Sequence, residues 1–414
     1  MIMNKEIFQI INEEFSIKLA NSKISSLRKK DIQKNAFRIY KDGFIGIAGS
    51  LGEIDEEFLE KKAVKALDNK IPYPYEITKN QCKTSSIGQD LISDEEFLKK
   101  TEELLDRLNK KHTDFTFSNS ISKTRSVKFL RNDENTELVS ELNYYETGIV
   151  FKHKNSKNIM DGFFGDEDIV YDTSRIEKMA DMMLDNYNNE LDFEDGEYPV
   201  VFLTMDTTGP LMKFIRDLHG MIFGTGSSLF SGRIGEKLFS ENFTLLQSAS
   251  YQDYEVIKHF FDNEGTFQEN FTIPLIENGV LKRPYTDKKT SEMFDFELTG
   301  SADGDFDSVP NLNYETFVVK SSEKTVEEIL GNRKAVIIFE ASGGDFTPDG
   351  KYASPVQLSY LYEGGELIGR LPQLNINSHV YDIYGKDFLG VPKDSILGLR
   401  DKDGMVVNME VSKI

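Results

Sequence analysis

The sequence contains one cysteine, Cys82, in 414 residues. A single thiol excludes an internal disulfide and any zinc or iron–sulfur site built from several cysteines, which agrees with a reducing compartment. No apolar run approaches the roughly 18 residues of a membrane-spanning helix, so no membrane span is expected. The first 20 residues are interrupted by charged side chains and do not resemble a secretory signal, so we expect a cytoplasmic location.

Positive charge is also scarce. Lysine and arginine number 49 against 70 aspartates and glutamates, which gives a formal net charge of −21. Such a surface repels phosphate backbones, so direct nucleic-acid binding is disfavoured. The acidity mainly indicates solubility, and it is compatible with basic peptide partners.

Several motifs of common enzymes are missing. The sequence has no Gly-x-Gly-x-x-Gly after a strand, no phosphate-binding loop ending in Gly-Lys-Ser/Thr, and no Gly-x-Ser-x-Gly nucleophile elbow. Four of the five histidines are isolated in sequence from one another and from acidic partners, and we interpret them as surface or hydrogen-bonded residues: His112, His153, His259 and His379.

The chain is organised around the stretch Pro199–Glu241. Val200–Met205 is a short apolar run typical of a buried strand, and Asp206 to Pro210 supplies a turn and a helix start. Apolar residues then recur at helical spacing until the glycine-rich run at Gly224, which predicts one continuous helix. They are Leu211, Phe214, Ile215, Leu218 and Ile222.

This helix lacks the ligand pattern of a metallopeptidase. His219 is followed by Gly220 rather than by an acid, and Phe223 stands where a second ligand would be needed. Asp217 is two residues away, and positions i and i+2 do not share a helix face. The favoured interpretation of His219 is a packed imidazole with one hydrogen bond. Asp217 and His219 together form at most a residual site.

The remaining pattern predicts an α+β protein of two domains, residues 1–190 and 191–414, because 414 residues exceed one ordinary core. The first is predicted to combine antiparallel strands with long helices, and to open with an amphipathic helix over Asn4–Ala20. The polar segment Asn188–Glu197 is the expected boundary. The second is predicted to be mainly antiparallel β around the central helix, with strands over Ser248–Phe260 and a hairpin at Asn278-Gly279.

Two loops are candidate binding segments. Thr299 to Asp307 carries acids at calcium-loop spacing, but Ser308 replaces the required glycine, so a mobile acidic loop over a cleft is favoured over a calcium site. The second, Ala341-Ser342-Gly343-Gly344-Asp345, follows a buried-looking strand, and its glycines leave backbone amides open to an extended peptide or an anion. The glycines could equally serve only a tight strand exit.

The order of motifs resembles the TldD/PmbA family along nearly the whole chain. The most specific segments are the turn Asp262-Asn-Glu-Gly265, the hairpin Ile276-Glu-Asn-Gly-Val-Leu281 and Ala341-Ser-Gly-Gly-Asp345. The resemblance implies a cytoplasmic α+β protein of two domains. It also implies a heterodimer in which a TldD-type subunit is a zinc peptidase with a His-Glu-x-x-x-His helix and a later cysteine, whereas the PmbA-type (TldE) partner lacks these ligands.

In this sequence the helix positions fall within Met212 to Phe223, where the His-Glu pair and second histidine are absent, and no cysteine follows Gly385. The chain is therefore similar to the PmbA side of the family, a subunit without catalytic or metal residues of its own, with zinc expected in its partner. The family label of DNA gyrase modulator would then describe an indirect role. If the likeness holds, Thr299, Gly300 and residues 341–345 would line the cleft and hold an extended peptide along a strand edge.

Two alternatives stay open at this point. One is a self-sufficient metallopeptidase with an atypical site drawn from Asp217, His219 and His259. The other is a homodimeric peptide-binding protein without catalysis.

Overall fold

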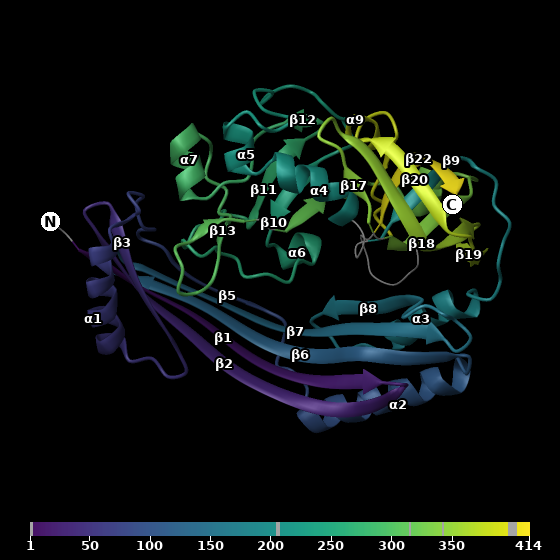
Figure 1. The fold of residues 1–414 in the computed structure, drawn as a ribbon, viewed down its shortest axis with the longest axis horizontal. Helices are drawn as coiled ribbons and strands as arrows, with labels where there is room; N and C mark the ends of the chain where they lie inside the picture. The colour runs from purple at the N-terminus through teal and green to yellow at the C-terminus, as the bar shows by residue number, and fades with distance from the viewer. Residues whose placement is uncertain (1–2, 204–207, 314–315, 342, 396–403) are drawn as a thin grey trace.

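A long, curved antiparallel sheet forms the first half of the chain, and the second half lies against one side of it (Figure 1). The computed structural model describes residues 3–203, 208–313, 316–341, 343–395 and 404–414. The strands follow the order β4-β3-β2-β1-β6-β7-β5, with β8 paired to β7. Their bounds are β1 Asn4–Ala20, β2 Lys23–Lys41, β3 Phe44–Leu51, β4 Ile71–Pro72, β5 Cys82–Ile87, β6 Phe115–Asn132, β7 Thr136–His153 and β8 Gly162–Asp168.

The helix predicted over Asn4–Ala20 is wrong, because this segment is the central strand β1. It pairs with β2 on one side and β6 on the other, so its backbone groups are bonded along both edges. Its isoleucines have the β-branched side chains that favour strands, and their spacing also fitted a helix. The strands β6 and β7 form a long antiparallel pair, and β7 continues through Gly148 without a turn.

Three helices accompany this sheet: α1 Glu56–Ala66, α2 Asp94–Lys111 and α3 Thr173–Asp185. Asp55 and Ser93 cap the first two, because their side chains accept free amides of the first turn. The third is capped by Asp172, whose carboxylate accepts the amides of Ser174 and Arg175. A short 3₁₀ turn, Leu67–Asn69, follows α1.

The second half contains a closed sheet. The strand order β16-β9-β22-β20-β18 returns to its start because β16 also pairs with β18, and β17, β19 and β21 attach to this barrel. The strands β18 and β19 form a hairpin that turns at Gly364-Gly365. The bounds are β9 Gly196–Phe202, β16 Ala335–Ala341, β17 Asp345–Phe346, β18 Lys351–Glu363, β19 Glu366–Arg370, β20 Leu374–His379, β21 Phe388–Gly390 and β22 Met405–Lys413.

A smaller sheet, β12-β11-β10-β15, and the pair β13-β14 lie beside the barrel. The predicted Asn278-Gly279 hairpin is confirmed, since both residues have positive φ between β11 and β12. The strands predicted over Ser248–Phe260 are wrong, because β10 ends at Ser248 and the short helix α6 follows. The bounds are β10 Leu245–Ser248, β11 Thr272–Glu277, β12 Val280–Leu281, β13 Ala302–Asp303, β14 Asn311–Leu312, β15 Phe317–Val319, α6 Tyr251–Tyr254, α7 Lys288–Phe294, α8 Val326–Leu330 and α9 Val380–Ile383.

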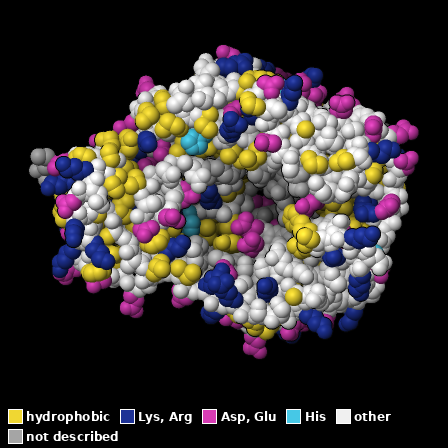
Figure 2. Space-filling view, viewed as in Figure 1, with side chains coloured by type: hydrophobic (Ala, Val, Ile, Leu, Met, Phe, Trp, Pro, Cys, Tyr) yellow, Lys and Arg dark blue, Asp and Glu magenta, His cyan; other side chains and the backbone are white. Residues whose placement is uncertain are grey.

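The two halves share apolar cores at two places. At one end, α2, α3 and β8 pack with barrel residues such as Ile337 and Tyr360. At the other, Phe8 and Leu130 of the long sheet pack with Phe260 and Phe261 of the second half. Between these contacts the molecule is hollowed, and acidic and apolar side chains line the opening (Figure 2). Among the described residues, no helix is both long and apolar enough to cross a membrane.

Candidate functional site

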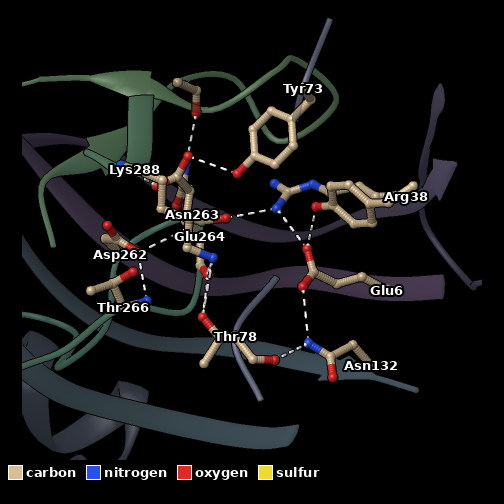
Figure 3. A network of polar contacts seen from close by, with 12 residues as sticks. Glu6, Arg38, Tyr73, Thr78, Asn132, Asp262, Asn263, Glu264, Thr266 and Lys288 are labelled. Carbon is tan, nitrogen blue, oxygen red and sulfur yellow. Dashed lines mark hydrogen bonds and ion pairs between the residues drawn. The ribbon is translucent and has the colours of Figure 1, made fainter. Parts of the chain in front are cut away.

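The Asp262–Gly265 turn of the second half is bonded to the first half of the chain (Figure 3). Arg38 Nη1 on β2 donates to the backbone carbonyl of Asn263 at 2.6 Å. The hydroxyl of Tyr73 donates to the carboxylate of Glu264 at 2.8 Å. These side chains are buried, so the turn joins the two halves through polar contacts away from water.

Two buried carboxylates shape this turn. Asp262 Oδ1 accepts the amides of Glu264 and Thr266 at 2.9 and 2.8 Å, and its Oδ2 accepts the amide of Ala302 at 2.9 Å. The Glu264 carboxylate accepts the amide of Lys288 at 2.9 Å. Burial raises the pKa of both acids, and the neighbouring Asp262 charge raises the pKa of Glu264 further.

A pocket of about 230 Å³ lies beside the turn, where the two halves meet. Thr299 and Gly300, which the sequence marks as candidate binding residues, both line it. Lys128 from β6 and His259 contribute a basic side chain and an imidazole, and phenylalanines provide apolar walls. The acidic loop beyond Asp303 packs against the long sheet, where a side chain at Gly49 would collide with Phe306 and Asp307.

The Thr299 side chain is used inside the fold. Its hydroxyl accepts the amide of Thr286 at 2.8 Å and contacts Ser301 at 3.1 Å, and the residue is buried. The carbonyls of Thr299 and Gly300 accept hydrogen bonds from Gln247. The predicted role of this pair in peptide binding stays a prediction. The Thr299 hydroxyl is already hydrogen-bonded within the fold.

The second candidate segment lies elsewhere. Ala341 ends β16, Gly343 has a φ of +83°, and Asp345 begins β17, while Ser342 lies outside the described residues. None of the described members of this segment lines the pocket of Thr299 and Gly300. In the described part of the barrel sheet, β17 is the outermost strand and pairs only with β18. Its second edge has no partner strand among the described residues, and α4 packs against β17.

The helix that carries Asp217 and His219 is interrupted. Instead of one helix to Ile222, α4 Thr208–Asp217 and α5 Gly220–Gly224 are separated at His219, which has extended backbone and caps α5 by accepting the amide of Met221 at 3.3 Å. Burial lowers the pKa of His219. Its ring lies edge-on against Tyr285, at 5.5 Å between centroids. At the break, the Gly220 amide donates to the Tyr285 carbonyl at 3.0 Å, and the Tyr285 amide donates to the Leu218 carbonyl at 2.9 Å.

Asp217 faces a different partner. Its carboxylate is 2.9 Å from Lys213 Nζ, and both side chains are almost completely buried. Lys213 also donates to the carbonyls of Thr347 and Pro348, at 3.2 and 3.0 Å. The ammonium therefore ties α4 to the loop after β17.

Comparison with known proteins shows the family to which the chain belongs. The sequence profile described as the PmbA/TldA metallopeptidase C-terminal domain matches residues 195–404, which is half of the chain. The chain belongs to the PmbA/TldD family. The fold is shared with TldE of Thermococcus kodakarensis, with a TM-score of 0.78 at 17% identity, covering 99% of this chain and 96% of that one. A protein named as a DNA gyrase modulator from Thermotoga maritima gives 0.80 at 17% identity, with the same coverage.

Relatives found by sequence match shorter segments of this chain than the two structures do. A metalloprotease of Methanocaldococcus jannaschii is 28% identical over 183 residues, or 44% of this chain and 40% of the relative. A zinc metalloprotease TldD homolog of Saccharolobus solfataricus is 23% identical over 229 residues, or 52% and 48%. The chain thus spans less than half the length of these relatives.

The donors present do not fit the zinc that the family name implies. At the Met212–Phe223 position, the single histidine caps α5, and Asp217, the one acid of this segment, is paired with Lys213. Across the described residues, one group of three metal-capable side chains lies close together, namely His112, Asp181 and Asp185. Lys111 bonds both aspartates there, at 2.9 and 3.0 Å, and so already supplies their cation. Asp217, His219 and His259 do not form such a group.

Sequence reasoning missed two features. The Asp262–Gly265 motif predicts a turn and supports the family resemblance, but the burial of its two acids is not predicted, although the adjacent Phe260 and Phe261 could have indicated it. A second pocket, of about 470 Å³, lies between Gly162 and Tyr187 of the first half and Glu340 and Arg370 of the barrel. No local pattern pointed to it, because its walls come from segments about 180 residues apart.

Proposed function

We propose that this chain is a TldE-type subunit that binds extended peptides and presents them to a zinc-bearing, TldD-like partner. The observation that carries the proposal is the Lys213–Asp217 ion pair at the helix where a TldD-type chain would hold its metal. A buried ammonium at this place opposes a divalent cation electrostatically. The fold likeness to TldE supports the same assignment.

The open edge of β17 supports peptide binding. A strand with one unpaired edge can accept an extended peptide through backbone hydrogen bonds, which requires no particular side chain. The space beside the adjoining Gly343 is empty, because a Cβ there would meet no atom closer than 3.9 Å, at Pro355. A side chain would project into the space that a peptide needs.

The assembly is tested by native mass spectrometry of the chain isolated gently from its own cells. A heterodimer with a TldD-like chain and one zinc is expected, and removal of that chain should remove the zinc. A homodimer that carries its own zinc would overturn the proposal. A metal-free homodimer would retain peptide binding but remove the role as a partner subunit.

The peptide edge is tested with two matched substitutions. Gly343→Ala and Gly365→Ala both place a Cβ at positive φ, +83° and +91°, and neither meets a close neighbour. Each should cost about 1–2 kcal/mol of stability. Only Gly343→Ala is expected to weaken capture of a fluorescent unfolded peptide, because Gly365 lies in the β18–β19 hairpin. Equal capture by both variants would contradict the assigned edge.

A further inference from the structure

The pocket of about 470 Å³ lies where the first half of the chain meets the exit of β16. Its volume is within the range of small-molecule and side-chain binding sites. Glu340, at the barrel side, immediately precedes the segment of Ala341 to Asp345 that leads to the open edge of β17. Glu340 is the one residue of this stretch that lines the pocket among those described, so a peptide that extends from that edge back to the end of β16 would reach the pocket at Glu340.

Glu340 has a carboxylate without a partner. Neither of its oxygens takes part in a hydrogen bond or ion pair within the described part of the chain, and Oε2 is out of contact with solvent. The side chain is partly buried, and burial raises its pKa. A carboxylate removed from water without compensating donors is unfavourable, so such a group is retained at a cost to stability.

The other charged residues of the pocket have partners, and Arg370 Nε is the one atom of these groups that is buried without a hydrogen bond among the described residues. Arg370 bonds Glu190 and lies over the ring of Tyr187, 4.3 Å from its centroid. Asp161 accepts three hydrogen bonds from its own loop, from residues 153, 156 and 158, at 2.8, 2.7 and 2.9 Å. With Arg370 balanced by Glu190, the pocket keeps the negative charges of Asp161 and Glu340.

We propose that this pocket binds a cationic hydrogen-bond donor of the peptide, a primary ammonium or a guanidinium, with Glu340 as its acceptor. This inference rests on the proposed peptide-binding function and gives it a substrate class, namely peptides that carry a basic group. A cation provides the donors that the Glu340 carboxylate lacks, and charge-assisted hydrogen bonds of this kind are among the strongest in proteins. The net charge of −21 attracts the same peptides at long range.

The cation has two sources in a peptide, a basic side chain or the free amino terminus, and three fluorescent peptides of equal length separate them. The first is acetylated at its amino terminus and carries one central lysine. The second is acetylated and carries glutamine at that position. The third has glutamine and a free amino terminus. Each is titrated against the full chain, Glu340→Gln and Glu366→Gln at fixed ionic strength.

Glu366→Gln is the matched control, because it removes one negative charge from an exposed position in the same barrel sheet. Glu340→Gln should fold, since the carboxylate makes no bond that the substitution would break, and circular dichroism and urea unfolding verify this. We expect the full chain and Glu366→Gln to bind a cationic peptide about ten-fold or more tightly than the acetylated glutamine peptide, and Glu340→Gln to lose this difference.

The outcomes are distinct. Preference for the lysine peptide supports a side-chain cation, and preference for the free amino terminus supports a terminal ammonium. Equal binding of all three peptides would overturn the cation site and leave peptide binding intact. A preference that persists in Glu340→Gln would also overturn it, because general electrostatic attraction would then account for the difference. If no peptide binds, the proposed function itself fails.

Discussion

Arg38 Nη1 bridges Glu6 of its own sheet, at 3.2 Å, and the backbone carbonyl of Asn263, at 2.6 Å. The guanidinium is completely buried and lies over the ring of Phe8, 4.6 Å from its centroid. A single charged side chain of the long sheet thus holds the turn of the second half in place. The arrangement fixes the walls of the pocket that Thr299 and Gly300 line.

Replacing Arg38 tests how much this bridge contributes to the free energy of unfolding. Arg38→Met leaves Glu6 buried without its cation, and removal of one partner of a buried ion pair typically costs about 3–5 kcal/mol. Arg28→Met is the matched control, because Arg28 is exposed on the same strand and should change stability by less than about 0.5 kcal/mol. Urea unfolding of both variants measures the difference. Similar losses would show that the bridge contributes little.

Glu264 should make stability depend on pH. Its pKa is raised from 4.5 to about 8 in the folded chain, so the folded state holds more protons than the unfolded state between these values. Stability from this group is present below about pH 4.5 and is lost as pH rises toward 8, by up to about 1.4 kcal/mol per pH unit. Urea unfolding from pH 5 to pH 8 should show a smaller decline for Glu264→Gln than for the parent chain. If the stability of both proteins declined equally with pH, the proposed contribution of Glu264 would be contradicted.

His259 should act in the opposite direction. Burial and the charges of Lys128 and Lys258 lower its pKa from 6.5 to about 3, so the folded chain keeps it neutral. Its contribution is present above about pH 6.5 and is lost as pH falls toward 3. His259→Gln should reduce the loss of stability in acid. Ser126→Ala removes the hydroxyl contacts with His259 at 3.0 Å and with Asn12 at 2.6 Å, and it should keep that acid slope, since burial is the main cause of the lowered pKa of His259.

Caps and tight turns can be recognised from sequence because their signals are local, whereas the single helix predicted to Ile222 is interrupted at His219. Asp55 and Ser93 cap helices where their side chains can reach free amides, and Asn278-Gly279 adopts the positive φ angles that its turn requires. The opening strand β1 could not be distinguished from a helix by the spacing of its isoleucines. Its pairing with β6, more than 100 residues away, decides its structure.

At the candidate site, too, contacts between residues distant in sequence could not be predicted. The glycine-rich exit after β16 could be recognised from sequence, and the family resemblance came from the order of such segments. The partners of Glu264 and the lack of a partner for Glu340 among the described residues could not be recognised, because both depend on which residues the tertiary fold brings together. Lys213 is four residues from Asp217, so that pair alone had a helical signal in the sequence.

The Lys213–Asp217 pair gives the sharpest test of how this chain differs from a metal-bearing relative. Asp217→Asn should cost about 3–5 kcal/mol, because the buried ammonium would keep only the carbonyls of Thr347 and Pro348. Glu57→Gln, which breaks the exposed i,i+4 pair with Lys61, should cost about 0.3–0.5 kcal/mol.

The double substitution Lys213→Met with Asp217→Leu removes both charges and should recover most of the stability lost in Asp217→Asn, because apolar residues of similar volume can replace a buried ion pair. Urea unfolding of the three variants supplies the comparison. If Asp217→Asn costs no more than Glu57→Gln, the ammonium is not held by this carboxylate. The electrostatic argument against a divalent cation at α4 would then lose its basis.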